Sequence, residues 1–254
     1  RPAWNNAPIM RHAMSRKSSL SLVLLWAGAC TAPVPTAPAA PSPAALETSV
    51  RPQVNARFLD PKLDVGEFVR TFEGESREIA RARDAIVAAL ALEPGTVLAD
   101  VGAGTGLFEP PFSATVGPTG RVLALEISPS FVDHLRQRVA DAELANVEVA
   151  LCSDRSVGLP EASIDAAFAC DTYHHFEYPT TTLASLHAAL RSSGRLYVLD
   201  FERTPGVSRQ WVLDHVRAGK QEVRAEIEAA GFRFDGELPV EGLAENYLLR
   251  FVRP

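Results

Sequence analysis

The sequence predicts an α/β fold, in which helices cover a mostly parallel sheet. Three observations lead to this prediction. Apolar, strand-like runs alternate with stretches of helical period, a glycine-rich loop follows the first such run, and the last two runs lie close together. Alternation of strands and helices favours parallel β-α-β units with right-handed crossovers. The two final runs favour an antiparallel hairpin at one end of the sheet.

The first predicted helix lies within residues 76–92 and ends before Pro94. Its apolar side chains recur at spacings of three and four residues, as one buried helix face requires: Ile79, Ala82, Ile86, Val87 and Leu90. Further helices are expected in the segment through Ala114 and at 130–144, 180–191 and 219–231. The strands are expected at 97–101, 121–127, 147–152, 164–170, 194–201, 232–238 and 246–252. Ser128 or Ser130 is available to cap the helix at 130–144.

Length and charge restrict the class of protein. A chain of 254 residues accommodates one full-sized domain, and 46% of its residues are hydrophobic. The net charge of -6 disfavours binding to nucleic acid, which needs a basic face. Cys30, Cys152 and Cys170 lack the spacing of metal ligands, so we expect no metal site and no disulfide framework. A small molecule is therefore the expected partner.

Residues 14–30 have the layout of a secretory signal. Basic residues open the segment, a short apolar run covers 20–26, and small residues precede Cys30. The segment resembles a bacterial lipoprotein signal, in which such a cysteine becomes lipidated, although Ala27 stands where that motif usually has leucine. The resemblance implies membrane anchoring through Cys30. A plain signal or a mistaken gene start are the alternatives, the last of which would leave the protein in the cytoplasm rather than the cell envelope.

The chain is predicted to have three parts. Residues 1–30 comprise upstream residues and the signal, and Met10 and Met14 are both candidate starts. Residues 31–56 are rich in proline and alanine, a composition typical of a disordered, extended linker. Residues 57–254 form the folded domain.

The stretch VLADVGAGTGLF, residues 97–108, predicts a nucleotide-type loop at the carboxyl end of a strand. Its glycines are Gly102, Gly104 and Gly106, whereas a dinucleotide fingerprint would place its last glycine at Leu107. The spacing therefore disfavours a pyrophosphate ligand and a nicotinamide dehydrogenase.

Two acidic residues indicate the charge of the ligand. Asp100 ends the first strand, where its carboxylate would disfavour a pyrophosphate by about 1–4 kcal/mol and favour a ligand with an ammonium group. S-adenosylmethionine carries an ammonium, a sulfonium and no phosphate. Glu126 ends the second strand, in position to accept ribose hydroxyls. The alternatives are a loop or helix cap for Asp100 and a surface acid for Glu126.

With these motifs, residues 73–252 resemble the class I S-adenosylmethionine-dependent methyltransferases, particularly the small-molecule group that includes the ubiquinone and menaquinone enzymes. The resemblance implies a Rossmann-like three-layer sandwich whose seven-stranded sheet has the order 3-2-1-4-5-7-6, with strand 7 antiparallel. Residues 192–194 stand in for the family's Pro-Gly-Gly turn. The implied role of Asp154 is contact with the adenine amino group. The implied cofactor-binding residues are Asp100, Gly102, Gly104, Gly106, Glu126, Ile127, Asp154, Arg155 and Asp171.

Candidates for the chemistry follow the fourth strand. Asp171, Tyr173, His174 and His175 lie within a few residues of one another at the expected mouth of the cofactor site. We assign Asp171, His174 and His175 as candidate catalytic residues, because histidine accepts protons near neutral pH. A structural role in shaping the pocket is the alternative for the histidines.

Two further groups have weaker assignments. Glu73, Glu75 and Arg77 precede the first predicted helix, where they form either a lid or a solvated charged face. Trp211 and His215 follow the fifth strand, where they either line an acceptor pocket or pack in the core.

The resulting hypothesis is a methyltransferase that uses S-adenosylmethionine and acts on an unidentified small-molecule acceptor, with membrane tethering if the signal operates. Because S-adenosylmethionine is made in the cytosol, export and activity are in conflict. The alternative hypothesis is a catalytically inactive lipoprotein that keeps the fold as a binding module. The sequence identifies neither the acceptor nor the oligomeric state.

Overall fold

The computed structural model describes residues 47–74 and 77–254, which belong to one compact unit, Ala45–Pro254. The predicted signal, Cys30 and the linker as far as residue 46 lie outside the described residues. The helices are α1 (Val65–Phe72), α2 (Glu78–Ala89), α3 (Glu109–Val116), α4 (Pro129–Asp141), the 3-10 helix η1 (Tyr173–His175), α5 (Pro179–Ala189), α6 (Gln210–His215) and α7 (Lys220–Ala229). The strands are β1 (Val97–Val101), β2 (Arg121–Glu126), β3 (Val147–Leu151), β4 (Ile164–Cys170), β5 (Leu190–Phe201), β6 (Arg233–Glu237) and β7 (Asn246–Val252).

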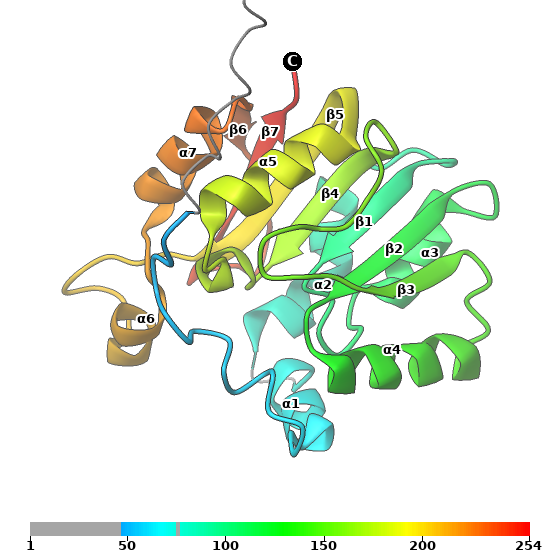
Figure 1. The fold of residues 1–254 in the computed structure, drawn as a ribbon, viewed down its shortest axis with the longest axis horizontal. Coiled ribbons are helices and arrows are strands. Elements are labelled where there is room, and N and C mark those ends of the chain that lie inside the picture. The colour runs from blue at the N-terminus through cyan, green and yellow to red at the C-terminus, as the bar shows by residue number, and fades with distance from the viewer. Residues whose placement is uncertain (1–46, 75–76) are drawn as a thin grey trace, which may run out of the picture. The chain divides into compact units, whose positions relative to one another are not determined.

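The seven strands form one sheet in the order β3-β2-β1-β4-β5-β7-β6 (Figure 1). The pairs among β1 to β5 are parallel, whereas β7 is antiparallel to both β5 and β6. Both the predicted order and the antiparallel hairpin at the end of the sheet are confirmed.

Alternate side chains of the strands enter two separate hydrophobic cores, which produces three layers. Leu98 of β1 packs with α2 and α3 on one face, whereas its neighbour Ala99 packs with α5 and α7 on the other. Figure 1 shows α5 and α7 in front of the sheet and α2 and α3 behind it. Both faces are therefore covered, as expected of a parallel sheet.

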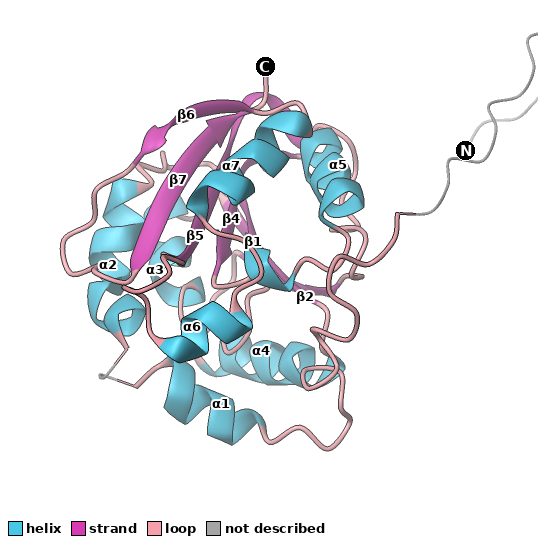
Figure 2. Cartoon of the chain, turned by 90° about the vertical axis from the view of Figure 1, so that its left-hand side faces the viewer, coloured by secondary structure: helices cyan, strands magenta, loops and turns pink. Residues whose placement is uncertain are grey.

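Three short elements were not predicted. Helix α1 has 8 residues and one buried side chain, Phe68, although Val65, Phe68, Val69 and Phe72 form an apolar stripe at helical spacing. Helix α6 likewise buries only Val212, and η1 has 3 residues. Helices α1 and α6 lie beyond the carboxyl ends of the parallel strands (Figure 2). These unpredicted elements are therefore near the expected ligand site.

The prediction of a serine cap on α4 is half right. Ser128 occupies the N-cap position, but its side chain makes no cap hydrogen bond and its Oγ is buried without a partner. Its backbone N–H instead donates to Glu126 Oε1 at 2.9 Å. The hydrogen bond to the glutamate therefore replaces the expected cap.

Residues 47–56, which we call the N-terminal segment, contact the domain even though they fall within the predicted linker. The carboxylate of Glu47 accepts hydrogen bonds from the backbone of Thr180 and Thr181 at 2.9 and 2.7 Å. Farther along, Asn55 Nδ2 donates to the carbonyl of His175 at 3.1 Å. Contacts with the folded unit thus begin before residue 57. Within residues 47–74 and 77–254, none of the helices has the length and apolar character needed to cross a membrane.

Candidate active site

A cavity of about 620 Å³ opens at the carboxyl ends of the parallel strands. The loops after β1, β2, β3 and β4 form one part of its wall, and the N-terminal segment, α1 and α6 form another. Its volume falls within the range of about 300–1,000 Å³ that is usual for small-molecule sites. The cavity lies at the edge of the sheet where the ligand is expected.

The glycine loop after β1, residues 102–106, forms part of the cavity wall. Gly104 has a φ of +56°, and the nearest atom to a Cβ built there would be the Gly102 carbonyl oxygen at 3.8 Å. Gly102, with a φ of +75°, lies so close to Thr172 that a Cβ would overlap its side chain. The loop therefore leaves space for a ligand at Gly104. Gly106 is not part of the wall and faces Leu135 and Arg138 of α4 instead.

Three buried acids meet near this loop. Asp100 is 3% exposed, and burial, followed by the charges of Glu109 and Glu126, raises its pKa well above the ordinary value. Burial also raises the pKa of Glu109 to about 7, and its carboxyl group pairs with that of Asp100. A cationic ligand group that reached Asp100 would therefore stabilise a charge that the protein alone disfavours.

Backbone N–H groups hold Glu126 against the loop. Its Oε2 accepts from Gly104 at 3.0 Å, and its Oε1 accepts from Ile127 at 2.8 Å and from Ser128. Burial raises the pKa of Glu126, and these three hydrogen bonds oppose that shift. Both Glu126 and Ile127 line the cavity. The contact between Glu126 and a ribose stays a prediction.

Two residues that were predicted to lie at the site, Arg155 and Tyr173, do not line the cavity. Arg155 does not line the cavity, because its guanidinium stacks 3.3 Å from the ring centroid of Tyr178 and donates to the Glu47 carbonyl. The hydroxyl of Tyr173 donates to Glu226 of α7 at 2.7 Å, on the opposite side of η1. Asp154, in contrast, is exposed and lines the cavity.

Asp171 lies in the cavity wall with a φ of +48°. It forms an ion pair with Arg77, and its Oδ1 accepts from Asn246 Nδ2 at 3.1 Å. Arg77 therefore contacts the loop after β4 rather than belonging to a solvated face. Glu73 also has a partner, Arg138 of α4, at 2.5 Å. Glu75 lies outside the described residues.

His174 is buried and held by one carboxylate. Its Nδ1 lies 2.8 Å from Asp200 Oδ1, and its backbone N–H donates to Asp200 Oδ2 at 3.1 Å. Asp200 is 1% exposed and also accepts from the backbone N–H of Phe201 at 2.8 Å. The carboxylate therefore fixes the orientation of the imidazole and leaves Nε2 free.

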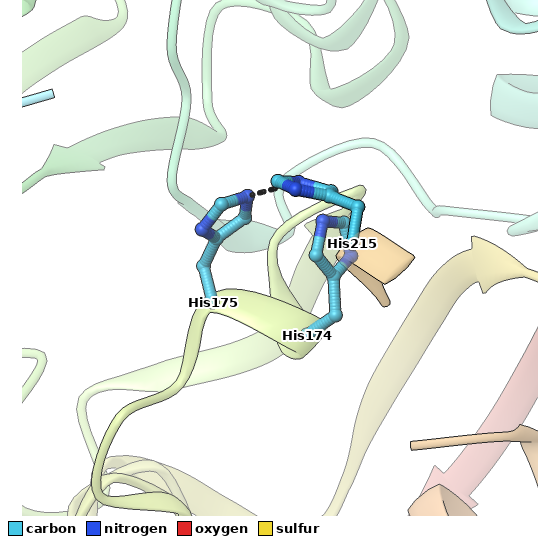
Figure 3. Close-up of side chains that lie close together, drawn as sticks. All are labelled: His174, His175 and His215. Carbon is cyan, nitrogen blue, oxygen red and sulfur yellow. Dashed lines mark hydrogen bonds between the residues drawn. The ribbon is translucent and has the colours of Figure 1, made fainter. Parts of the chain in front are cut away.

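Beside it, His175 and His215 face each other, with their Nε2 atoms 3.3 Å apart (Figure 3). Burial, followed by the charges of His174 and other cationic neighbours, lowers the pKa of His175 to about 2 and that of His215 to about 4. Both rings are therefore neutral near pH 7, and His175 is a poor proton acceptor. Trp211 stacks on His215 at 4.7 Å between ring centroids, and both side chains line the cavity.

Sequence reasoning missed several residues of the site. Glu109 begins α3 directly after the glycine loop, and a glutamate in the first turn of a helix normally signals only a favourable helix dipole. Asp200 is the second-last residue of β5, beside the predicted site. That position was the only feature of the sequence that indicated a role for it in the site. Other wall residues that were not predicted include the aromatic side chains Phe58, Phe68, Phe72 and Phe131.

Comparison with known proteins agrees with this geometry. Residues 99–198 match the family model described as a methyltransferase domain. The segment resembles a methyltransferase. A stretch of 117 residues, 46% of this chain, is 27% identical to the ubiquinone/menaquinone biosynthesis C-methyltransferase UbiE of Ralstonia pickettii, strain 12J, and covers 48% of that relative. The chain thus spans about half the length of the curated relatives that it matches.

Solved structures share the fold. A methyltransferase of Aquifex aeolicus that depends on S-adenosylmethionine has a TM-score of 0.66 at 23% identity, over 76% of this chain and 100% of its own. The [4+2]-cyclase SpnF has a TM-score of 0.58 at 17% identity, over 69% of this chain and 81% of its own. The methyltransferase matches support S-adenosylmethionine as the cofactor. The residues fit it, because a buried carboxyl group and open space at Gly104 adjoin each other.

Proposed function

We propose that the protein is an S-adenosylmethionine-dependent methyltransferase that acts on a small-molecule acceptor. The observation that carries this proposal is a single cavity that contains two different regions. The region around Asp100, Gly104 and Glu126 has the acids and open backbone that suit the cofactor. The other region is lined by aromatic rings and histidines, which suit a second molecule.

In this proposal, bound S-adenosylmethionine supplies an activated methyl group on its sulfonium. Asp100 pairs with the ammonium group of the cofactor, and Glu126 remains available to its ribose through Oε2, which accepts one hydrogen bond in the structure. Methyl transfer mainly requires correct placement of the acceptor. The protein supplies this placement by holding the acceptor between the aromatic wall and the histidines.

The acceptor is inferred from the lining of its region. Phe58, Phe68, Phe131 and Trp211 contribute apolar surface, whereas His174 contributes a buried polar atom. These side chains favour a largely apolar molecule that carries one nucleophilic polar group. The match to the quinone methyltransferase covers 46% of this chain and 48% of that relative, so the acceptor is inferred from the cavity alone.

We also propose that the domain is exported and tethered. In this proposal residues 14–30 act as a lipoprotein signal, Cys30 is lipidated, and the proline-rich residues that follow connect it to the domain. S-adenosylmethionine is made in the cytosol, so the activity of such a protein depends on cofactor outside it. Cofactor binding and location therefore require separate experiments.

Calorimetric titration of the full chain tests the proposed function. We expect S-adenosylmethionine and S-adenosylhomocysteine to bind with one site per chain and NAD to show no binding. Failure of both methionine compounds to bind would refute the proposal. Binding without transfer of the methyl group to apolar acceptors that carry hydroxyl, thiol or amine groups would favour the inactive binding module.

A further inference from the structure

Three histidines from two separate elements meet in the acceptor region, and we call them the histidine cluster. His174 and His175 lie on η1, and His215 ends α6. One ring nitrogen from each lies within 4.8 Å of the others, and Figure 3 shows the rings turned toward one another. A pair of hydrogen-bonded imidazoles would account for His175 and His215 but leaves the third ring unexplained.

The spacing of the rings fits a metal ion. In a tetrahedral zinc site, Zn–N distances of about 2.0–2.1 Å place two ligand nitrogens about 3.3–3.4 Å apart. The Nε2 atoms of His175 and His215 are already 3.3 Å apart. The ring centroid of His174 lies 4.3 and 5.0 Å from those of His175 and His215, and the three ligand nitrogens lie within 4.8 Å of one another.

The surroundings of His174 are typical of a metal ligand. Metal-binding histidines usually donate their second ring N–H to a carboxylate, which fixes the tautomer and orients the ring. Asp200 accepts from Nδ1 of His174 in this way, at 2.8 Å, while two backbone N–H groups hold the carboxylate in place. This arrangement directs the lone pair of Nε2 toward the other two rings.

One acidic and one basic side chain lie near the histidine cluster. Asp200 provides a buried negative charge, whereas Arg51 provides a positive charge and donates to the carbonyls of Asp214 and His215. Among the described residues the cluster is the one group of three or more histidine, cysteine or acidic side chains close enough to hold a metal ion.

We propose that the histidine cluster binds a divalent transition-metal ion, of which Zn²⁺ best suits three imidazole ligands. All three rings line the cavity, so a fourth coordination position would face it, as in catalytic rather than structural zinc sites. If the proposed function holds, that position takes the nucleophilic oxygen, sulfur or nitrogen atom of the acceptor. The sequence spacing gave no indication of this site, because His215 is 40 residues from His175.

Zinc titration tests the site without any assay of activity. The full chain is freed of metal with a chelator and titrated calorimetrically with zinc chloride. We expect one Zn²⁺ per chain, and we expect His175→Ala and His215→Ala to abolish this binding. His187→Ala is the control and should keep it, because His187 packs against Phe232 on the side of the sheet that α5 covers. Asp200→Asn should weaken binding about 10–100-fold, as loss of an orienting carboxylate does.

The Co²⁺-loaded protein gives a second measurement. The unaltered chain should show the intense visible absorption of tetrahedral Co²⁺, and His215→Gln should abolish it while circular dichroism remains unchanged. Absence of stoichiometric zinc binding, or equal binding by the unaltered chain and both alanine variants, would overturn the inference. Titration of the same metal-free protein with S-adenosylmethionine shows independently whether the proposed function fails.

Discussion

Asp100 and Glu109 are acids that the fold buries almost completely. Glu109 is fully buried, and its carboxyl group pairs with that of Asp100. Burial raises the pKa of both groups, and the charge of Glu109 further disfavours ionisation of Asp100. The ligand-free protein therefore retains protons here that exposed carboxylates would have lost. The positive charge of a ligand's ammonium group would stabilise the ionised carboxylates, and these protons would then be released.

The first prediction concerns the charge of Asp100. Asp100→Asn keeps the size of the side chain and removes the carboxylate, so binding of S-adenosylmethionine should weaken. A hydrogen bond to a charged group contributes about 1.5–3 kcal/mol, which corresponds to roughly a ten- to hundredfold loss of affinity. Calorimetry measures it, with the exposed Asp133→Asn as the control. Equal affinity in the Asp100 variant would show that the ammonium group binds elsewhere.

The second prediction is a dependence of stability on pH. Folding raises the pKa of Glu109 from 4.5 to about 7, so between these values the folded state binds more protons than the unfolded state. The free energy of unfolding should therefore fall as pH rises through this interval. Urea unfolding at a series of pH values measures the slope. Glu109→Gln should reduce it, and the exposed Glu148→Gln should not. An unchanged slope in Glu109→Gln contradicts the assignment.

At the scale of elements, the loops after β1 and β4 support each other. The hydroxyl of Thr172 donates to the carbonyl of Cys170 at 2.9 Å, and its side chain fills the space beside Gly102. Gly104, two residues farther on, faces open space instead. The same loop therefore contains one glycine required for packing and another required for access.

The third prediction separates these two roles. Gly104→Ala should fold with a loss of about 1–2 kcal/mol, the usual cost of a left-handed alanine, and bind S-adenosylmethionine poorly because its Cβ enters the cavity. Gly102→Ala should lose more stability, because its Cβ also overlaps Thr172. Gly206→Ala, with a φ of +80° and open space around it, controls for backbone strain away from the cavity. Urea unfolding and calorimetry give both quantities. Normal cofactor affinity in Gly104→Ala would contradict the proposed placement.

Elements with regular periodicity were predictable from the sequence. Strands β1 and β7 were predicted with their observed bounds, because each is an apolar run with clear flanking turns. Helices α1 and α6 were not predicted, since each buries one side chain and depends on contacts that are distant in sequence. Phe68 of α1, for example, packs 5.5 Å from Phe131 of α4.

The site was predictable to a similar extent. Asp100 and Glu126 follow strands at positions where the topology brings their side chains together, so their spacing was sufficient. Arg155 was also expected there by resemblance, but its stacking on Tyr178 turns it away. The partnership of His174 with Asp200 joins η1 to the end of β5 across 26 residues of sequence, and no local pattern encodes it.

At the scale of the whole molecule, the N-terminal segment joins the site to the part of the chain that precedes it. Burial opposes ionisation of Glu47, but hydrogen bonds from Thr181 and Thr180 outweigh this effect and lower its pKa. Val50 donates to the carbonyl of Glu177 at 3.0 Å. The folded unit therefore holds this segment at several points.

The fourth prediction addresses the proposed tether. When the full chain is expressed in bacteria, it should sediment with membranes, because acyl chains contribute about 0.8 kcal/mol per buried methylene. Cys30→Ser should release it into the soluble fraction, and Cys152→Ser should leave it bound. A chain that is soluble before any mutation, or Cys30→Ser protein that still sediments with membranes, would refute the anchor.

The two backbone contacts of the N-terminal segment have a mechanical consequence for the site. Asn55 holds the carbonyl of His175, and Arg51 holds that of His215, so one short stretch of chain sets the separation of two rings that face the cavity. None of the strands depends on these bonds. Tension on this stretch, or its proteolytic removal, would therefore change the gap between the rings while the sheet stays intact. The segment thus acts as a spacer between the two rings.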